Sequence, residues 1–112
     1  MSQTKEIKTA QEMKDILEPI PADQWCAWHF HLGTQCCFLG HINKAIKDNP
    51  SGDFNGFGAR QLTAKYLKEK HGITDGSSGA SVNNEPTING YTEPVIKDRV
   101  MHLIDDMIKD GY

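Results

Sequence analysis

The segment from Trp25 to His41 gathers the side chains of this chain that are best suited to chemistry. It holds all three cysteines, both tryptophans and three of the five histidines. Thiolate and imidazole groups bind zinc, and a thiolate beside an imidazole base is a nucleophile. Buried thiols and aromatic rings, in contrast, pack in hydrophobic cores. The segment is therefore a metal site, an active site or a seam of the core, and we favour the core because aromatic clusters build cores more often than sites.

A zinc site would draw its ligands from Cys26, His29, His41 and one of the adjacent thiols, Cys36 or Cys37, of which Cys37 is the candidate. Cys37 and His41 are four positions apart, so they share one face of an expected helix. The spacing matches none of the common zinc patterns, and the adjacent pair Cys36-Cys37 is not a Cys-x-x-Cys motif. The metal candidates, in a chain for which we expect no cofactor, are Cys26, His29, Cys37 and His41.

A catalytic thiol would be Cys36 or Cys37 at the N-terminus of the same helix. The unpaired backbone N–H groups and the helix dipole stabilise a thiolate at such a position. The base would be one of four histidines, and one of two asparagines would orient it: His29, His31, His41 or His71, with Asn83 or Asn84. This alternative is a thiol-dependent hydrolase or transferase whose candidate catalytic residues are Cys36, Cys37, His41 and Asn83.

Hydrophobic periodicity and capping signals predict about four helices around this segment. The first begins at the capping box Thr9-Ala10-Gln11-Glu12 and ends at Pro19. The second runs from about Cys36 to before Pro50, and the third covers residues 59–70 with Gly72 as its cap. The last covers residues 94–109 and carries the longest apolar face of the chain.

The segments between these helices lack helical periodicity. Residues 23–35 are aromatic and turn at Gly33-Thr34, which favours a short strand or hairpin. Residues 51–58 and 74–90 are rich in Gly, Ser and Asn and are expected to be surface loops. The fold class is therefore mainly α (α+β), a small single domain over residues 1–112 with a short β-hairpin.

The bulk properties exclude several classes of function. The chain has 112 residues, and 12 Lys and Arg against 15 Asp and Glu give a net charge of −3, so we expect no nucleic-acid partner. No apolar run approaches the roughly 20 residues that span a bilayer, and the N-terminus lacks the apolar stretch of a signal peptide. An odd number of cysteines, two of them adjacent, is not a disulfide framework. We therefore expect a cytosolic protein with reduced thiols and no membrane contact.

Three short motifs resemble those of a family of small uncharacterised proteins of bacteria and phages. The motifs are Cys37-Phe38-Leu39-Gly40, Val82-Asn83-Asn84 and Lys97-Asp98-Arg99-Val100. They are similar to the family's Cys-Ala-Leu-Gly motif, its Trp-Asn-Asp motif and its final Lys-x-x-Val helix, and Trp25 fits the Trp-containing segment upstream. The resemblance runs from Trp25 to Ile108 and implies one domain, but no reaction.

This chain departs from the family pattern at three positions. Phe38 replaces a small residue, Val82 stands for Trp, and Asn84 stands for Asp. Because the two central motifs occur together in the family, we expect Asn83 or Asn84 to turn inward and to hydrogen-bond the backbone near residues 36–40.

Without a complete catalytic motif, binding is the function that the sequence favours. We expect a small accessory or inhibitory protein, of the kind found in phages, that docks on a larger protein through its polar loops. A thiol-dependent enzyme is the alternative, and a zinc-stabilised domain is a third possibility. The sequence gives no oligomeric state.

Overall fold

The computed structural model describes residues 5–28, 31–33 and 35–112, and about half of them lie in five α-helices. The helices are α1 (Ala10–Leu17), α2 (Phe38–Ile46), α3 (Gly58–His71), α4 (Gly79–Asn84) and α5 (Ile96–Lys109). Two 3-10 turns and two short strands accompany them: η1 (Ala22–Gln24), η2 (Phe54–Gly56), β1 (His31–Leu32) and β2 (Gln35–Cys36). The strands pair antiparallel, so the expected mainly α class with a short hairpin is confirmed.

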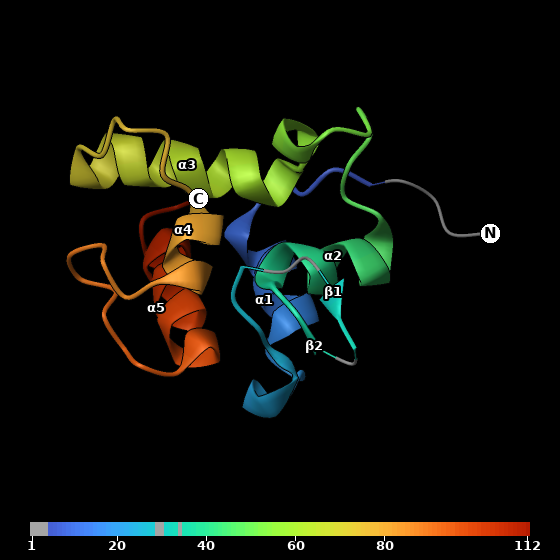
Figure 1. Cartoon of the computed structure of the whole chain (residues 1–112). Coiled ribbons are helices and arrows are strands. Elements are labelled where there is room, and N and C mark those ends of the chain that lie inside the picture. The colour runs from blue at the N-terminus through green and yellow to red at the C-terminus, as the bar shows by residue number, and fades with distance from the viewer. Residues whose placement is uncertain (1–4, 29–30, 34) are drawn as a thin grey trace.

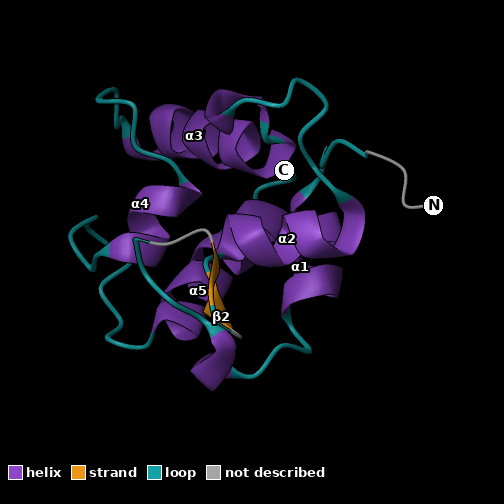
Figure 2. Cartoon of the chain, turned by 45° about the vertical axis from the view of Figure 1, so that its right-hand side comes forward, coloured by secondary structure: helices purple, strands orange, loops and turns teal. Residues whose placement is uncertain are grey.

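The helices enclose one hydrophobic core. α3 crosses one side of the molecule, and the other four helices lie beneath it in the view of Figure 1. Figure 2 shows the hairpin on the side of α2 that faces away from α3. α5 packs against α1 and α4, and α2 packs against α1 and α4. The largest fully buried side chains come from all five helices and include Met13, Leu17, Phe38, Leu39, Ile42, Leu67, Val82, Leu103, Ile104 and Met107.

Local capping signals set the start of α1 and the end of α3, as predicted from the sequence. Thr9 accepts a hydrogen bond from the Glu12 backbone N–H, and Glu12 accepts one from the Thr9 N–H, which completes the capping box of α1. At the end of α3, Gly72 is left-handed with φ 67°, and the Ile73 N–H donates to the Leu67 carbonyl. These two caps confirm the predicted start of α1 and end of α3.

The start of α3 depends on the carboxylate of Asp48, whose role was not predicted from the sequence. Asp48 is fully buried, and its two carboxylate oxygens accept hydrogen bonds from the backbone N–H groups of Ala59, at 2.8 Å, and Ile7, at 2.6 Å. The N-cap residue Phe57 offers no capping side chain of its own. Asp48 therefore caps α3 from a distance and fixes the direction in which the chain enters it.

The second helix begins two residues later than expected. Cys36 lies in β2, where it pairs with His31 and forms a parallel bridge with Trp25. Cys37 is extended as well, with ψ 174°, and is the N-cap of α2. The prediction that α2 starts at Cys36 was wrong because pairing with two other segments holds Cys36 in a strand.

α4 lies in the segment that was expected to be a surface loop. Ser78 caps it, and Val82 and Asn83 are fully buried. Its first residue must be glycine, because a Cβ on Gly79 would lie 2.6 Å from the Phe38 ring. The prediction of a loop over residues 74–90 was wrong because residues 79–84, of which only Ala80 has high helix propensity, form a helix through tertiary contacts.

The last helix has the predicted apolar face but starts at Ile96, two residues after the expected Pro94. Val95 is its N-cap and accepts the hydrogen bond of the Arg99 N–H. Val100, Leu103 and Ile104 are buried on its inner face. Among the described residues, no helix combines the length and the apolar composition that crossing a membrane requires.

Replacing Ile104 with alanine is expected to lower the free energy of unfolding by roughly 2–5 kcal/mol, because the side chain is fully buried and the packed helices cannot close the cavity. Urea denaturation followed by circular dichroism measures the change. The control is Lys109→Ala on the exposed side of the same helix, with an expected change within about 0.5 kcal/mol. A loss below about 1 kcal/mol for Ile104→Ala would contradict the central place of this face in the core.

Candidate functional site

The side chain of Asn83 joins α4 to the two chain segments that flank the hairpin. It is fully buried. Its Oδ1 accepts a hydrogen bond from the Phe38 N–H at 3.2 Å, and its Nδ2 donates to the Cys26 carbonyl at 2.9 Å. The prediction of an inward-facing asparagine bonded to the backbone near residues 36–40 is confirmed.

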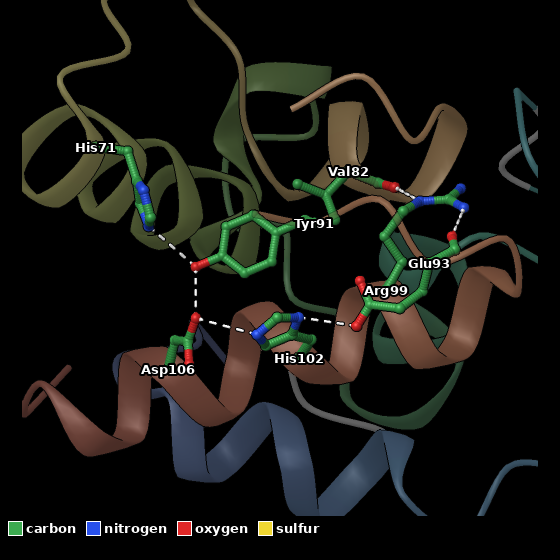
Figure 3. Close-up of polar contacts among 7 residues, drawn as sticks. All are labelled: His71, Val82, Tyr91, Glu93, Arg99, His102 and Asp106. Carbon is green, nitrogen blue, oxygen red and sulfur yellow. Dashed lines mark hydrogen bonds and ion pairs between the residues drawn. The ribbon is translucent and has the colours of Figure 1, made fainter. Parts of the chain in front are cut away.

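Arg99 holds the backbone of α4 from the opposite side. Its Nε donates to the Val82 carbonyl at 2.5 Å, and its Nη2 donates to the Asn83 carbonyl at 2.7 Å. Its Nη1 donates to the Glu93 carbonyl at 2.7 Å (Figure 3 includes the contacts to Val82 and Glu93). The Val82 and Asn83 carbonyls lack partners within so short a helix, and a cation is favourable at a helix C-terminus. Arg99 therefore fixes α4, and through it the side chain of Asn83.

The position of Arg99 within the apolar pattern of α5 is a sequence signal for this role. Arg99 lies four positions before Leu103 and next to Val100, on the face of α5 that points into the core. A cation inside an apolar face must find hydrogen-bond acceptors in the folded protein. The position of Arg99 therefore indicates a guanidinium group that is bound inside the fold. It does not indicate which carbonyls the guanidinium binds.

An apolar hollow of about 340 Å³ opens where α2, α4, η2 and the segment before the hairpin meet. We call it the aromatic pocket, and its walls are Trp28, Cys37, Leu39, Phe54, Phe57, Ala80 and Asn84. Two of these side chains expose large rings to solvent, with 64% of Trp28 and 55% of Phe54 accessible. These two rings are the exposed part of the pocket wall, whereas the ring of Phe57 is buried.

One contact holds each of the two exposed aromatic residues at the edge of the pocket. The backbone N–H of Trp28 donates to Oδ1 of Asn84 at 2.7 Å, and Trp28 has a left-handed backbone with φ 67°. That conformation is strained for a bulky residue, so the hydrogen bond offsets a real cost. On the other side the Arg60 guanidinium lies 4.8 Å from the centre of the Phe54 ring.

Cys37 is the candidate thiol that reaches this pocket. It is half-buried at the N-terminus of α2 and forms part of the pocket wall. Burial raises the pKa of its thiol, and hydrogen bonds from the backbone of Gly40 and Leu39 only partly oppose that effect. The thiol form is therefore favoured over the thiolate near neutral pH.

Three other candidate residues of the Cys- and His-rich segment, Cys26, Cys36 and His41, are buried. The His41 ring lies 5.4 Å from the Trp25 ring, and its Nε2 hydrogen-bonds the Gln24 carbonyl at 2.8 Å. Because the acceptor is a carbonyl, Nε2 must carry the proton, and burial lowers the pKa of His41. His41 is thus a neutral core histidine rather than the base of a Cys37 nucleophile.

The metal candidates are only partly described. His29 lies outside the described residues, and for His31 the structure gives the strand pairing alone. Within residues 5–28, 31–33 and 35–112, no group of three or more His, Cys, Asp or Glu side chains is arranged to hold a metal ion. Of the candidate residues, the structure brings Cys37 and Asn84 together at the pocket and sets Asn83 behind them.

A second polar cluster connects the end of α3, the loop before α5 and α5 itself (Figure 3). The Tyr91 hydroxyl donates to Asp106 at 2.8 Å and contacts His71 Nε2 at 3.0 Å. The His102 ring lies between two carboxylates, with Nδ1 2.8 Å from Glu93 and Nε2 3.6 Å from Asp106. Burial and the Asp106 carboxylate raise the pKa of Tyr91, so the phenol keeps its proton and acts as a structural donor.

The acidic residues near the end of α5 bind other parts of the fold. Asp105 pairs with Lys14 at 3.0 Å, and the exposed Asp110 accepts a hydrogen bond from Tyr66 at 2.6 Å. Together with Asp106, which accepts from Tyr91, these carboxylates join the C-terminal part of α5 to α1, to α3 and to the loop before α5.

Comparisons of this chain with protein-family models, with curated proteins and with solved structures found no match. The resemblance to the bacterial and phage family stays a prediction.

Asn83→Ala is expected to lower the free energy of unfolding by at least about 2 kcal/mol, because it leaves the buried Phe38 N–H and Cys26 carbonyl without partners. The matched variant is Asn84→Ala, which removes the hydrogen bonds that Oδ1 of Asn84 accepts from the exposed Trp28 backbone N–H and from Asn83 Nδ2. Because the bonds of Asn83 to Phe38 and Cys26 remain, this variant should cost about 1 kcal/mol. Urea denaturation compares the two. Equal losses for both variants would show that Asn83 is not the special contact between α4 and α2.

Proposed function

We propose that this protein acts by binding another protein, which inserts an apolar side chain into the aromatic pocket. The observation that carries the proposal is the pocket itself, an apolar hollow of about 340 Å³ with Trp28 and Phe54 exposed at its rim. Exposed tryptophan beside a pocket is a common centre of binding energy in protein interfaces.

The construction of the pocket supports this proposal. Its polar framework is internal, because Asn83 and Arg99 satisfy backbone groups behind the wall, and the described wall is mostly apolar. A rigid, preformed wall lowers the entropy lost on binding. The partner surface that fits it is a hydrophobic side chain with a polar surround.

The biological setting belongs to the same proposal. The role we propose is that of a small accessory or inhibitory protein, of the kind found in phages, that docks on a larger protein. We place that role in the cytosol, where unpaired thiols remain reduced. Neither a nucleic acid nor a membrane is part of the proposed interaction.

One observation favours the thiol-dependent hydrolase or transferase as a second candidate. Cys37 lies at the N-terminus of α2 in the pocket wall, where the backbone of Gly40 and Leu39 acts to lower the pKa of its thiol. An oxyanion could be held in the same place. Against this candidate, burial raises the pKa of Cys37, and His41 binds the Gln24 carbonyl.

Trp28→Ala is expected to weaken the binding of the natural partner about tenfold or more, because it removes an exposed ring at the pocket rim. Affinity capture from cells of the source organism, quantified by mass spectrometry, identifies a protein bound by the wild type. Titration calorimetry with that protein then gives the affinities. Ala80→Phe, which fills the pocket without removing a ring, should weaken binding as well.

The matched control for this experiment is Lys68→Ala, an exposed substitution on α3 outside the pocket wall. It should bind like the wild type. Undiminished binding by both pocket variants would contradict the proposal and place the interface elsewhere.

Cys37 is expected to react with a disulfide reagent more slowly than the cysteine of a short unstructured peptide at pH 8. Its raised pKa leaves a smaller fraction of thiolate at that pH, so its rate should still be rising as the pH increases further. The Cys37→Ala variant assigns the reaction phase. A rate above that of the peptide, lost when one particular histidine is replaced, would favour the thiol enzyme instead.

A further inference from the structure

Cys26 lies beside the start of α2, with both of its backbone polar groups bound there. Its N–H donates to the Cys36 carbonyl at 3.1 Å. Its carbonyl accepts from the Asn83 side chain, which in turn accepts from the Phe38 N–H. Cys26 is therefore held against the segment that runs from Cys36 to Phe38, and Cys37 is the residue in the middle of that segment.

The strand register places Cys37 directly across from Cys26. Trp25 and Cys36 are partners in a parallel bridge, so the next residue on each segment is also a neighbour in register. In extended chains successive side chains point to opposite faces. Trp25 and Cys36 share one face, and Cys26 and Cys37 share the other, since Cys37 continues the extended conformation.

This arrangement meets the main requirement of a disulfide. Neighbouring residues on paired strands have their Cα atoms about 5 Å apart, within the range of roughly 4.4–6.8 Å that disulfides need. The alternative partner, Cys36, is close enough to raise the pKa of Cys26, but the alternation of side chains along extended segments assigns Cys26 and Cys36 to opposite faces. A bond between the adjacent residues Cys36 and Cys37 would need a distorted backbone.

We infer that Cys26 and Cys37 form a reversible disulfide when the protein meets a hydroperoxide. In the first step the Cys37 thiolate attacks the peroxide, gives a sulfenic acid and releases hydroxide, which takes up the proton that Cys37 lost. The Cys26 sulfur then attacks the sulfenic sulfur and expels water. In total two thiols and one hydrogen peroxide give one disulfide and two water molecules.

The accessibility of the two thiols sets the order of these steps. Cys37 is half-buried at the wall of the aromatic pocket, whereas only 7% of Cys26 is accessible. Peroxide therefore reaches Cys37 first, and Cys26 resolves the sulfenic acid from behind. Because burial raises the pKa of Cys37, the reaction is slow at neutral pH and faster at pH 8.5.

The test treats the full native chain with excess hydrogen peroxide at pH 8.5, blocks remaining thiols by alkylation and digests the protein without reduction. Chymotrypsin is suitable because aromatic residues lie between Cys26 and Cys37, whereas no Lys or Arg does. Tandem mass spectrometry then assigns the linked residues. We expect most crosslinked peptide to join Cys26 to Cys37, with Cys36 alkylated after denaturation, and a reducing agent to restore both thiols.

Variants and a denatured sample separate this outcome from a chance reaction. Cys37→Ser and Cys26→Ser should abolish the crosslink, and Cys36→Ala should retain it. In urea the preference for Cys37 over Cys36 should disappear, which shows that the fold selects the pair even if one variant folds poorly. A dominant link of Cys26 to Cys36, a bond within Cys36-Cys37, or crosslinks only between chains would each overturn the inference.

Discussion

The fold depends on the burial of one very short helix. α4 has six residues, so nearly all of its terminal N–H and carbonyl groups must find partners outside the helix. Ser78 and Thr63 supply acceptors at its start, and Arg99 supplies donors at its end. Once these groups are satisfied, α4 can lie against α2 and α5 with Val82 and Asn83 inside the core. The position of Asn83 then decides where the N-terminus of α2 and the segment before the hairpin meet.

The sequence predicts the elements whose signals are local. The Thr9 capping box, the glycine cap of α3 and the apolar face of α5 each depend on a few neighbouring residues, and the structure agrees with them. α4 could not be predicted in this way, because its Gly, Ser and Asn residues have low helix propensity and its stability comes from Thr63 and Arg99, which are distant in sequence. The start of α2 was displaced for a similar reason, since Cys36 pairs with Trp25.

The Cys- and His-rich segment divides between the core and a pocket, which residue types alone could not show. Trp25 and His41 pack together in the core, whereas Trp28 and Cys37 face the aromatic pocket. The left-handed backbone of Trp28 redirects the chain just before the hairpin, and the sequence gives no sign of it because such a conformation is rare for tryptophan. Phe54 and Phe57 join this pocket from a segment that was predicted only as a Gly-rich loop. The predicted hydrogen bond between the Asn83 side chain and the backbone near residues 36–40 was confirmed, but the contact of Arg99 with the Asn83 carbonyl was not predicted.

Amide hydrogen exchange at Phe38 tests this account most directly. Phe38 is the first residue of α2, so its N–H has no acceptor within the helix, and its partner is the side chain of Asn83. The account predicts that the Phe38 amide of the wild type is protected, and that Arg99→Gln removes this protection while the Leu67 amide in α3 remains slow to exchange. A Phe38 amide that exchanges in the wild type like an exposed one, or that keeps its protection in Arg99→Gln, would contradict the claim that Arg99 and Asn83 together hold α4 against α2.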